Sequence, residues 1–255
     1  MQIYVVRSGD TLDSIGRKLG LAPGFLARYN GLREPYRLAV GQSLLVLYPS
    51  KSVTVQPGDT LASLAQANGV SLPGLYRMNP NLSGSSRIYP GQTLVTGLER
   101  AATRGAFVTG YAYANADAAT LRGILPYAGA LAPFTYGFTS EAQLVPMQDA
   151  QLLTLAREFD VRALLHLSTL TENGTFSALQ AGQVLREEAL QRKLADAVIA
   201  EMQQKGYGGL DVDFEYLGAE LAGAYAQFLQ LLHEKLAPLG SGPIKQYNKV
   251  FGKAA

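Results

Sequence analysis

Three acidic residues at the end of a predicted strand could do chemistry together. In the segment LDVDFE, Asp211, Asp213 and Glu215 alternate with Val212 and Phe214. Successive side chains of a strand point to opposite faces, so the three carboxylates would share one face and the two apolar side chains the other. A parallel strand that only filled a core would be apolar on both faces. We therefore interpret the acidic row as a candidate active site, in which neighbouring carboxylates hold different protonation states.

The acidic row also has a structural interpretation, in which the carboxylates are solvated or cap the following helix. We favour the catalytic interpretation because three like charges in one row repel each other. The chain has no cysteine, and His166 and His233 are far apart in sequence, so we expect neither a metal site nor a cofactor. His166 lies in an apolar strand, where it could face the interior of a barrel. A core histidine with satisfied hydrogen bonds is the interpretation we favour.

Strands and helices alternate around the acidic row. The predicted strands are 106–113, 131–138, 163–169 and 208–216, and the predicted helices are 116–127, 149–159, 182–205 and 220–236. Segment 140–147 could form a hairpin inserted after the second strand. This alternation favours a parallel α/β architecture with right-handed crossovers.

The N-terminal part of the chain contains an internal repeat. Gly9-Asp10-Thr11-Leu12 returns 49 residues later as Gly58-Asp59-Thr60-Leu61. In each copy we expect a strand, a turn at the glycine, and a helix capped by the Asp-Thr pair. A second helix, opened by Pro23 or Pro73, should end near Asn30 or Asn79, before a loop and a closing strand. Each copy is therefore predicted to fold as strand–helix–helix–strand.

Both copies resemble LysM modules, which bind chains containing N-acetylglucosamine. The resemblance covers nearly all of residues 2–97 and implies one βααβ module over 2–48 and another over 52–97. In LysM modules the sugar lies in a groove between the first strand–helix loop and the second helix–strand loop. In the second of these loops, the implied residues lie near 32–40 and 82–90. In the first, the implied substrate-binding residues are Gly9, Asp10, Thr11, Gly58, Asp59 and Thr60. For each of them a turn or helix cap alone is an equally good explanation.

The acidic row resembles the signature of family 18 glycoside hydrolases, aspartate-glycine-x-aspartate-x-aspartate-x-glutamate on the fourth strand of a TIM barrel. Here it reads GGLDVDFE, with Gly208 in place of the first aspartate. The third strand ends HLSTL, without the glycine pair common in chitinases. Paired LysM repeats before such a barrel, together with DVDFEY, look most like spore cortex-lytic N-acetylglucosaminidases of endospore-forming bacteria.

This resemblance implies hydrolysis with substrate-assisted retention. The 2-acetamido oxygen of the substrate would attack the anomeric carbon, while Glu215 protonates the leaving oxygen and later activates water. Asp213 would orient the acetamido group and stabilise the oxazolinium ion, and Asp211 would tune Asp213. Near the strand ends, Tyr111, Tyr113 and Tyr136 are candidates for lining the sugar cleft, although aromatic core packing explains them about as well.

A complete TIM barrel takes about 250 residues. We expect 98–105 to be a linker and 106–255 to be a truncated barrel domain of four strand–helix units. The ending SGPIKQYNKVFGKAA departs from the preceding Ala/Leu-rich style and suggests truncation, a frameshift or an added tail. The predicted fold class is therefore α/β and multidomain, with two βααβ modules and a partial (β/α)8 barrel.

Composition limits the function classes. Residues 1–100 hold ten Lys/Arg against five Asp/Glu, whereas residues 101–255 hold twelve against fifteen. A basic N-terminal part suits a polyanionic polymer, but the basic residues are scattered without a recognition helix, so we do not expect nucleic acid as a partner. No apolar run approaches the roughly 20 residues that span a bilayer.

The sequence thus predicts a peptidoglycan-binding glycosidase of the spore cortex or cell wall that hydrolyses N-acetylglucosamine linkages. One alternative is a non-catalytic peptidoglycan- or chitin-binding protein with an incomplete barrel, and another is a binder of chitin or lipochitooligosaccharides. No secretory signal is visible at the start of the sequence. We therefore expect synthesis in the mother-cell cytoplasm and deposition on the spore.

Overall fold

The computed structural model describes residues 2–99 and 106–239. The chain divides into two compact units, the first containing the repeats with residues 122–127 and the second formed by residues 107–121 and the chain from 128 onward. Most of the predicted linker and the ending beyond residue 239 lie outside the described residues. Within the described ranges, no helix combines the length and apolar character needed to cross a membrane.

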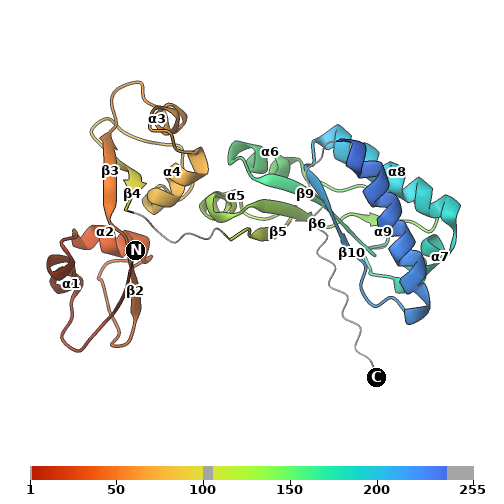
Figure 1. The fold of residues 1–255 in the computed structure, drawn as a ribbon, viewed down its shortest axis with the longest axis horizontal. Coiled ribbons are helices and arrows are strands. Elements are labelled where there is room, and N and C mark those ends of the chain that lie inside the picture. Colours follow the sequence, from red (N-terminus) through yellow and green to blue (C-terminus); the bar gives the residue numbers. More distant parts are fainter. Residues whose placement is uncertain (1, 100–105, 240–255) are drawn as a thin grey trace. The chain divides into compact units, whose positions relative to one another are not determined.

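Both repeats fold as strand–helix–helix–strand, which confirms the prediction (Figure 1). The first repeat consists of β1 (Gln2–Val5), α1 (Leu12–Leu19), α2 (Pro23–Tyr29) and β2 (Ser43–Val46). The second consists of β3 (Pro49–Thr54), α3 (Leu61–Ala67), α4 (Leu72–Met78), the short 3-10 helix η1 (Pro80–Leu82) and β4 (Thr93–Leu98). In each repeat the opening and closing strands pair antiparallel.

An asparagine joins the second helix of each repeat to its closing strand. Asn79 is fully buried, and its Nδ2 donates to the carbonyl oxygens of Leu75 (2.9 Å) and Val95 (2.8 Å). The backbone N–H of Val95 donates back to Asn79 Oδ1 at 2.8 Å. Asn30 makes the equivalent three bonds in the first repeat. The asparagine that ends each helix is thus also what fixes the strand after the loop.

The second unit contains four parallel strands, as predicted, and the structure places them in the order β10-β9-β6-β5. The strands are β5 (Thr109–Tyr113), β6 (Ala130–Phe134), β9 (Arg162–Ser168) and β10 (Gly209–Asp213), and the helices are α5 (Ala118–Ile124), α6 (Ala150–Glu158), α7 (Ala178–Arg186), α8 (Glu188–Lys205) and α9 (Ala222–Leu236). Short 3-10 helices cover Ala219–Leu221 and Ala237–Leu239, and another covers Leu125–Tyr127 in the segment that belongs to the first unit. This sheet with its crossover helices is a partial (β/α)8 barrel.

A hairpin follows the second strand, but it begins earlier than the expected 140–147: β7 (Gly137–Phe138), predicted as the end of the second strand, pairs with β8 (Leu144–Val145). The prediction of one long helix over 182–205 is wrong, because α7 and α8 are separate helices. Ser177 begins α7 early by accepting a hydrogen bond from the N–H of Gln180 at 3.1 Å. Glu187 then adopts extended angles, and the buried Gln191 side chain donates to the carbonyl of Leu185 at 2.6 Å. The Gln191 side chain thus satisfies a backbone carbonyl at the end of α7. In a continuous helix, that carbonyl would have accepted a backbone hydrogen bond instead.

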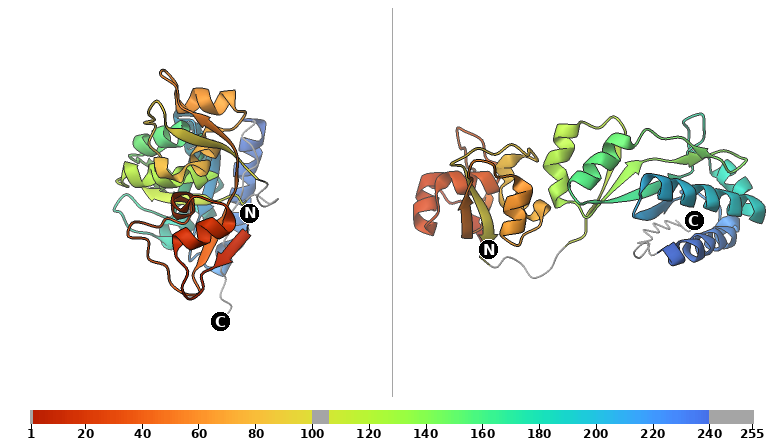
Figure 2. Two further views of the ribbon diagram at one scale, coloured as in Figure 1. Left: turned by 90° about the vertical axis from the view of Figure 1, so that its left-hand side faces the viewer. Right: turned by 90° about the horizontal axis from the view of Figure 1, so that it is seen from above.

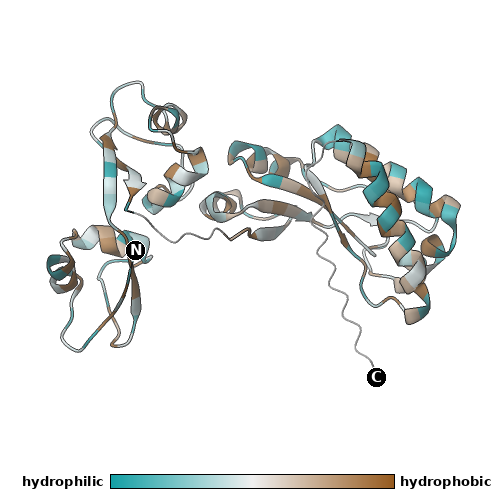
Figure 3. Cartoon of the chain, viewed as in Figure 1, coloured by the Kyte–Doolittle hydropathy of each residue, from teal (hydrophilic) through white to brown (hydrophobic). Residues whose placement is uncertain are grey.

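The helices of the second unit shield an apolar core. α8 and α9 are neighbours in Figure 1 and in the right-hand view of Figure 2, and they contact each other. Hydrophilic and hydrophobic positions alternate around both helices (Figure 3), as expected of helices with one buried side. Leu194 and Val198 of α8 and Phe228 of α9 are fully buried. Phe228 also stacks on Phe214, which directly follows β10 in the acidic row.

Candidate active site

A pocket of about 800 Å³ in the second unit collects the predicted acidic residues. Its walls come from β5, β6, β9 and β10 and from the residues next to them. The lining residues are Phe107, Val108, Thr109, Tyr111, Ala112, Tyr113, Phe134, His166, Asp211, Asp213 and Glu215. Asp211, Asp213 and Glu215 therefore face one space, whereas Phe214 turns the other way and stacks on Tyr225 and Phe228 of α9. The alternation predicted along this segment is confirmed.

The three carboxylates differ in exposure. The side chain of Asp211 is 2 % exposed and that of Asp213 is 38 % exposed, and Glu215 lies beyond the strand in an exposed position. Water screens the outer charges more than the inner one, so the row avoids the repulsion of three buried anions. The outermost carboxylate is thus open to solvent and to a ligand, while the innermost is enclosed.

Hydrogen bonds compensate the burial of Asp211. Its Oδ2 accepts from the hydroxyl of Tyr111 at 2.8 Å and lies 3.0 Å from Nδ1 of His166. The parallel register places Asp211 directly opposite His166, so the two side chains meet across neighbouring strands. Buried carboxylates are tolerated when donors of this kind surround them.

Aromatic rings form one wall of the pocket. Phe134 stacks on the His166 ring with centroids 5.1 Å apart, and Tyr113 meets Phe134 edge-on at 5.3 Å. Tyr111 and Tyr113 are 52 % and 64 % exposed. Exposed aromatic faces beside acidic groups suit a ligand that has apolar ring faces and hydroxyl edges.

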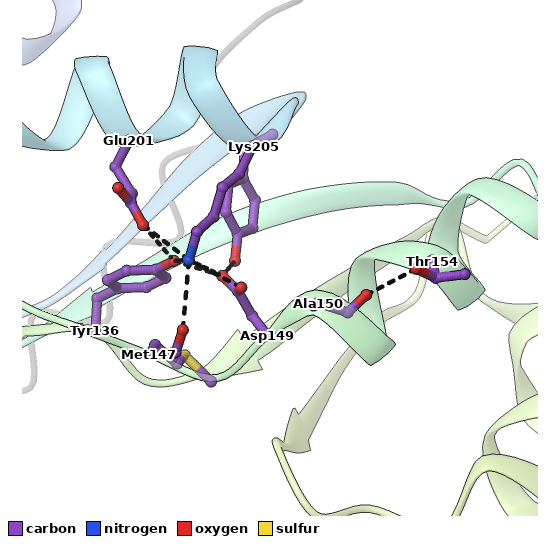
Figure 4. Close-up of polar contacts among 8 residues, drawn as sticks. Tyr136, Met147, Asp149, Ala150, Thr154, Glu201 and Lys205 are labelled. Carbon is purple, nitrogen blue, oxygen red and sulfur yellow. Dashed lines mark hydrogen bonds and ion pairs between the residues drawn. The ribbon is translucent and has the colours of Figure 1, made fainter.

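The expectation that Tyr136 lines the cleft is wrong. This side chain is fully buried, and its hydroxyl contacts Asp149 and Glu201 and accepts from Lys205 Nζ at 2.7 Å (Figure 4). Burial raises the pKa of Tyr136 well above its usual range, and the hydrogen bond to Asp149 adds to this effect. Tyr136 therefore belongs to a buried polar cluster with Asp149 and Lys205, and the residues that line the acidic pocket do not include it.

The six residues predicted to bind sugar in the repeats all support turns and caps. Gly9 and Gly58 have φ values of 82° and 89°, which favour glycine. Thr11 and Thr60 cap α1 and α3 through reciprocal bonds with the serine three residues later.

The two aspartates of these turns accept backbone bonds. Asp10 accepts from the N–H of Arg7 at 2.8 Å, a bond that lowers the pKa of Asp10, and Asp59 accepts from the N–H of Gln56 at 2.7 Å. Sugar contacts at the six turn and cap residues stay a prediction.

The helix–strand loop of the second repeat, implied as a sugar-binding loop near 82–90, forms a pocket lined by Asn81, Leu82, Ser85, Arg87, Tyr89 and Gln92, and Tyr89 is 65 % exposed. Sequence reasoning missed the place of one further residue. His166, expected as a core histidine, is buried but lines the acidic pocket, and its Nε2 has no hydrogen-bond partner among the described residues. Aligning HLS of β9 with DVD of β10 in parallel register would have brought His166 to Asp211.

Comparison with known proteins agrees with the two-part organisation. Residues 4–46 and 53–96 match the LysM domain, so the chain carries two LysM domains. The cortical fragment-lytic enzymes of Bacillus anthracis and Bacillus cereus are 30% and 31% identical to it over 240 residues, covering 92% of this chain and 56% of each relative. The crystal structure of the Bacillus cereus spore cortex-lytic enzyme SleL superposes with a TM-score of 0.65 at 29% identity, covering 92% of this chain and 56% of that chain. This chain thus spans about half the length of the relatives it matches.

Proposed function

We propose that this chain binds peptidoglycan through its LysM domains and supplies the acid-bearing part of a glycosidase that cleaves N-acetylglucosamine linkages of the spore cortex or cell wall. The observation that carries the proposal is the pocket in which three carboxylates of graded exposure meet aromatic faces. The similarity to cortical fragment-lytic enzymes over 92% of the chain supports the substrate class.

In the proposed reaction, Glu215 is the general acid. Its exposed position beyond β10 lets it approach the leaving oxygen, protonate it, and later take a proton from water. The acetamido oxygen of the substrate attacks the anomeric carbon and forms an oxazolinium ion. Asp213 is partly exposed beside Glu215, and its carboxylate stabilises this cation. Asp211 is buried at the inner end of the acidic row, where its charge tunes Asp213.

A second candidate function is binding without hydrolysis. It is favoured by the two LysM domains, which form a compact unit with their own core around Ile15, Leu26, Leu75 and Leu94. Such a protein would hold peptidoglycan or chitin without changing it.

The release of reducing ends from purified cortex and vegetative peptidoglycan separates these two functions. We expect the chain to sediment with both polymers, and a protein in which it is joined to the rest of a barrel to release reducing ends from at least one of them. Sedimentation without release would favour the binding function. Tighter retention on chitin than on peptidoglycan would instead indicate that chitin oligomers are the ligand.

A further inference from the structure

A single imidazole ring lies between two of the three carboxylates of the pocket. The His166 side chain is 1 % exposed, stacked on Phe134 and met edge-on by Tyr111. Its Nδ1 lies 3.0 Å from Asp211 Oδ2, and its Nε2 lies 3.9 Å from Asp213 Oδ2. Because the neighbouring rings hold the imidazole in place, each nitrogen faces one carboxylate.

The hydrogen-bonding capacity of these groups restricts where protons can be. An ionised carboxylate only accepts, so Nδ1 donates its proton to Asp211. In a neutral ring, Nε2 would then present a lone pair to the carboxylate of Asp213, and this buried nitrogen has no other hydrogen-bond partner among the described residues. Two acceptors that face each other cannot bond, so the buried Nε2 is left unsatisfied, whereas the partly exposed Asp213 is solvated. A proton on Nε2 removes the conflict, and a small turn of the partly exposed Asp213 side chain would complete the bond.

The charges around the ring favour the same state. The other titratable residues that line the pocket are Tyr111, Tyr113, Asp211, Asp213 and Glu215, so among its described lining His166 alone can become a cation. Burial disfavours a cation, but adjacent carboxylates on two sides oppose that effect. Buried ions persist in proteins when they are paired and hydrogen-bonded in this way.

We propose that His166 is a positioning residue that keeps Asp213 ionised, an inference that rests on the proposed glycosidase function. A proton on Asp213 Oδ2 passes to His166 Nε2: the nitrogen lone pair forms the new N–H bond, and the electrons of the broken O–H bond stay on the oxygen. Asp211 balances the charge of the imidazolium. Asp213 then faces the substrate as a carboxylate when positive charge develops on the sugar, and Glu215 keeps the proton that is transferred to the leaving group.

Nitrogen NMR of the full chain tests this proton location directly. The chain has only two histidines, and exposed His233 on α9 serves as an internal reference. In ¹⁵N-labelled protein at pH 7 without sugar, long-range ring correlations distinguish a protonated from a bare nitrogen. We expect both nitrogens of His166 to be protonated in the wild type. A bare Nε2 in the wild type would overturn the proposal, whatever the variants show.

Matched aspartate variants identify the partner of Nε2. Asp213→Asn should leave Nε2 bare, because an amide N–H can donate to the lone pair and the negative charge is gone. Asp196→Asn, at an exposed ion pair with Lys235, should leave the His166 spectrum unchanged. An Nε2 that stays protonated in Asp213→Asn would overturn the assignment of Asp213 as its partner.

A separate titration with N-acetylglucosamine oligomers tests the proposed function. If these oligomers shift no pocket resonance, the glycosidase proposal is weakened, while the proton location measured without sugar stands by itself.

Discussion

Replacement of Lys205 by methionine should destabilise the second unit by about 2–4 kcal/mol. Lys205 Nζ lies 2.9 Å from Asp149 Oδ1 and 2.8 Å from Glu201 Oε1, and the side chain of Asp149 is only 3 % exposed. Removal of one partner of a buried ion pair typically costs about 3–5 kcal/mol, since it leaves a charge without its counterion. The expected loss is smaller here because the hydroxyls of Tyr136 and Tyr207 remain bonded to Asp149.

Urea unfolding of the second unit measures this loss, and Lys235→Met is the matched control. Lys235 also lies in the last turn of a helix and pairs with Asp196 at 2.6 Å, but the side chain of Asp196 is 64 % exposed. Exposed pairs contribute about 0–1 kcal/mol, so the control should change the free energy of unfolding by less than 1 kcal/mol. Equal losses in the two variants would refute the idea that burial sets the strength of the Lys205 pair.

The same cluster predicts a pH dependence. Burial acts to raise the pKa of Asp149, but hydrogen bonds from Tyr136, Tyr207 and Lys205 outweigh it and lower the pKa below its ordinary value. A lowered folded-state pKa stabilises the fold above the unfolded value of about 3.9, and this contribution is lost as the pH falls through the folded value. The acid limb of the stability profile should therefore become shallower in Lys205→Met than in the control variant.

Three further variants test other parts of the structure. Asn79→Ala should lower the free energy of unfolding by about 2–4 kcal/mol in denaturant titrations, because it removes three buried bonds. Thr60→Ala should cost about 1 kcal/mol for the lost cap, yet peptidoglycan sedimentation should persist if its role is structural. Tyr111→Phe should weaken the binding of N-acetylglucosamine oligomers in calorimetry, whereas Tyr136→Phe should reduce only thermal stability. The opposite pattern would indicate that Tyr136, and not Tyr111, contacts the sugar.

The sequence was most informative where a local pattern has one structural solution. The repeated Gly-Asp-Thr segments predicted the start of α1 and α3 because a glycine turn followed by a threonine cap fixes the first helical residue. The alternation of acidic and apolar residues predicted the two faces of β10, since side chains on a strand can point only two ways.

Contacts between distant segments could not be predicted in this way. Tyr136 was misplaced because its direction depends on Asp149 and Lys205, which follow 13 and 69 residues later. His166 looked like a core residue because its strand is apolar, and only the register with β10 places it beside two carboxylates. The break at Glu187 depends on Gln191 reaching back to cap α7, which helical periodicity does not reveal.

The central claim is that Glu215 is the acid of a glycosidase, and one pair of variants tests it most directly. Glu215→Gln keeps the shape of the side chain but cannot donate a proton, whereas Glu220→Gln changes an exposed glutamate that pairs with Arg186. General acid catalysis is worth about 10²–10⁴-fold. With cortex peptidoglycan as substrate, the release of reducing ends should fall by about that factor in Glu215→Gln and stay near wild type in Glu220→Gln, with sedimentation unchanged in both. Hydrolysis by the wild type that survives Glu215→Gln would contradict the account.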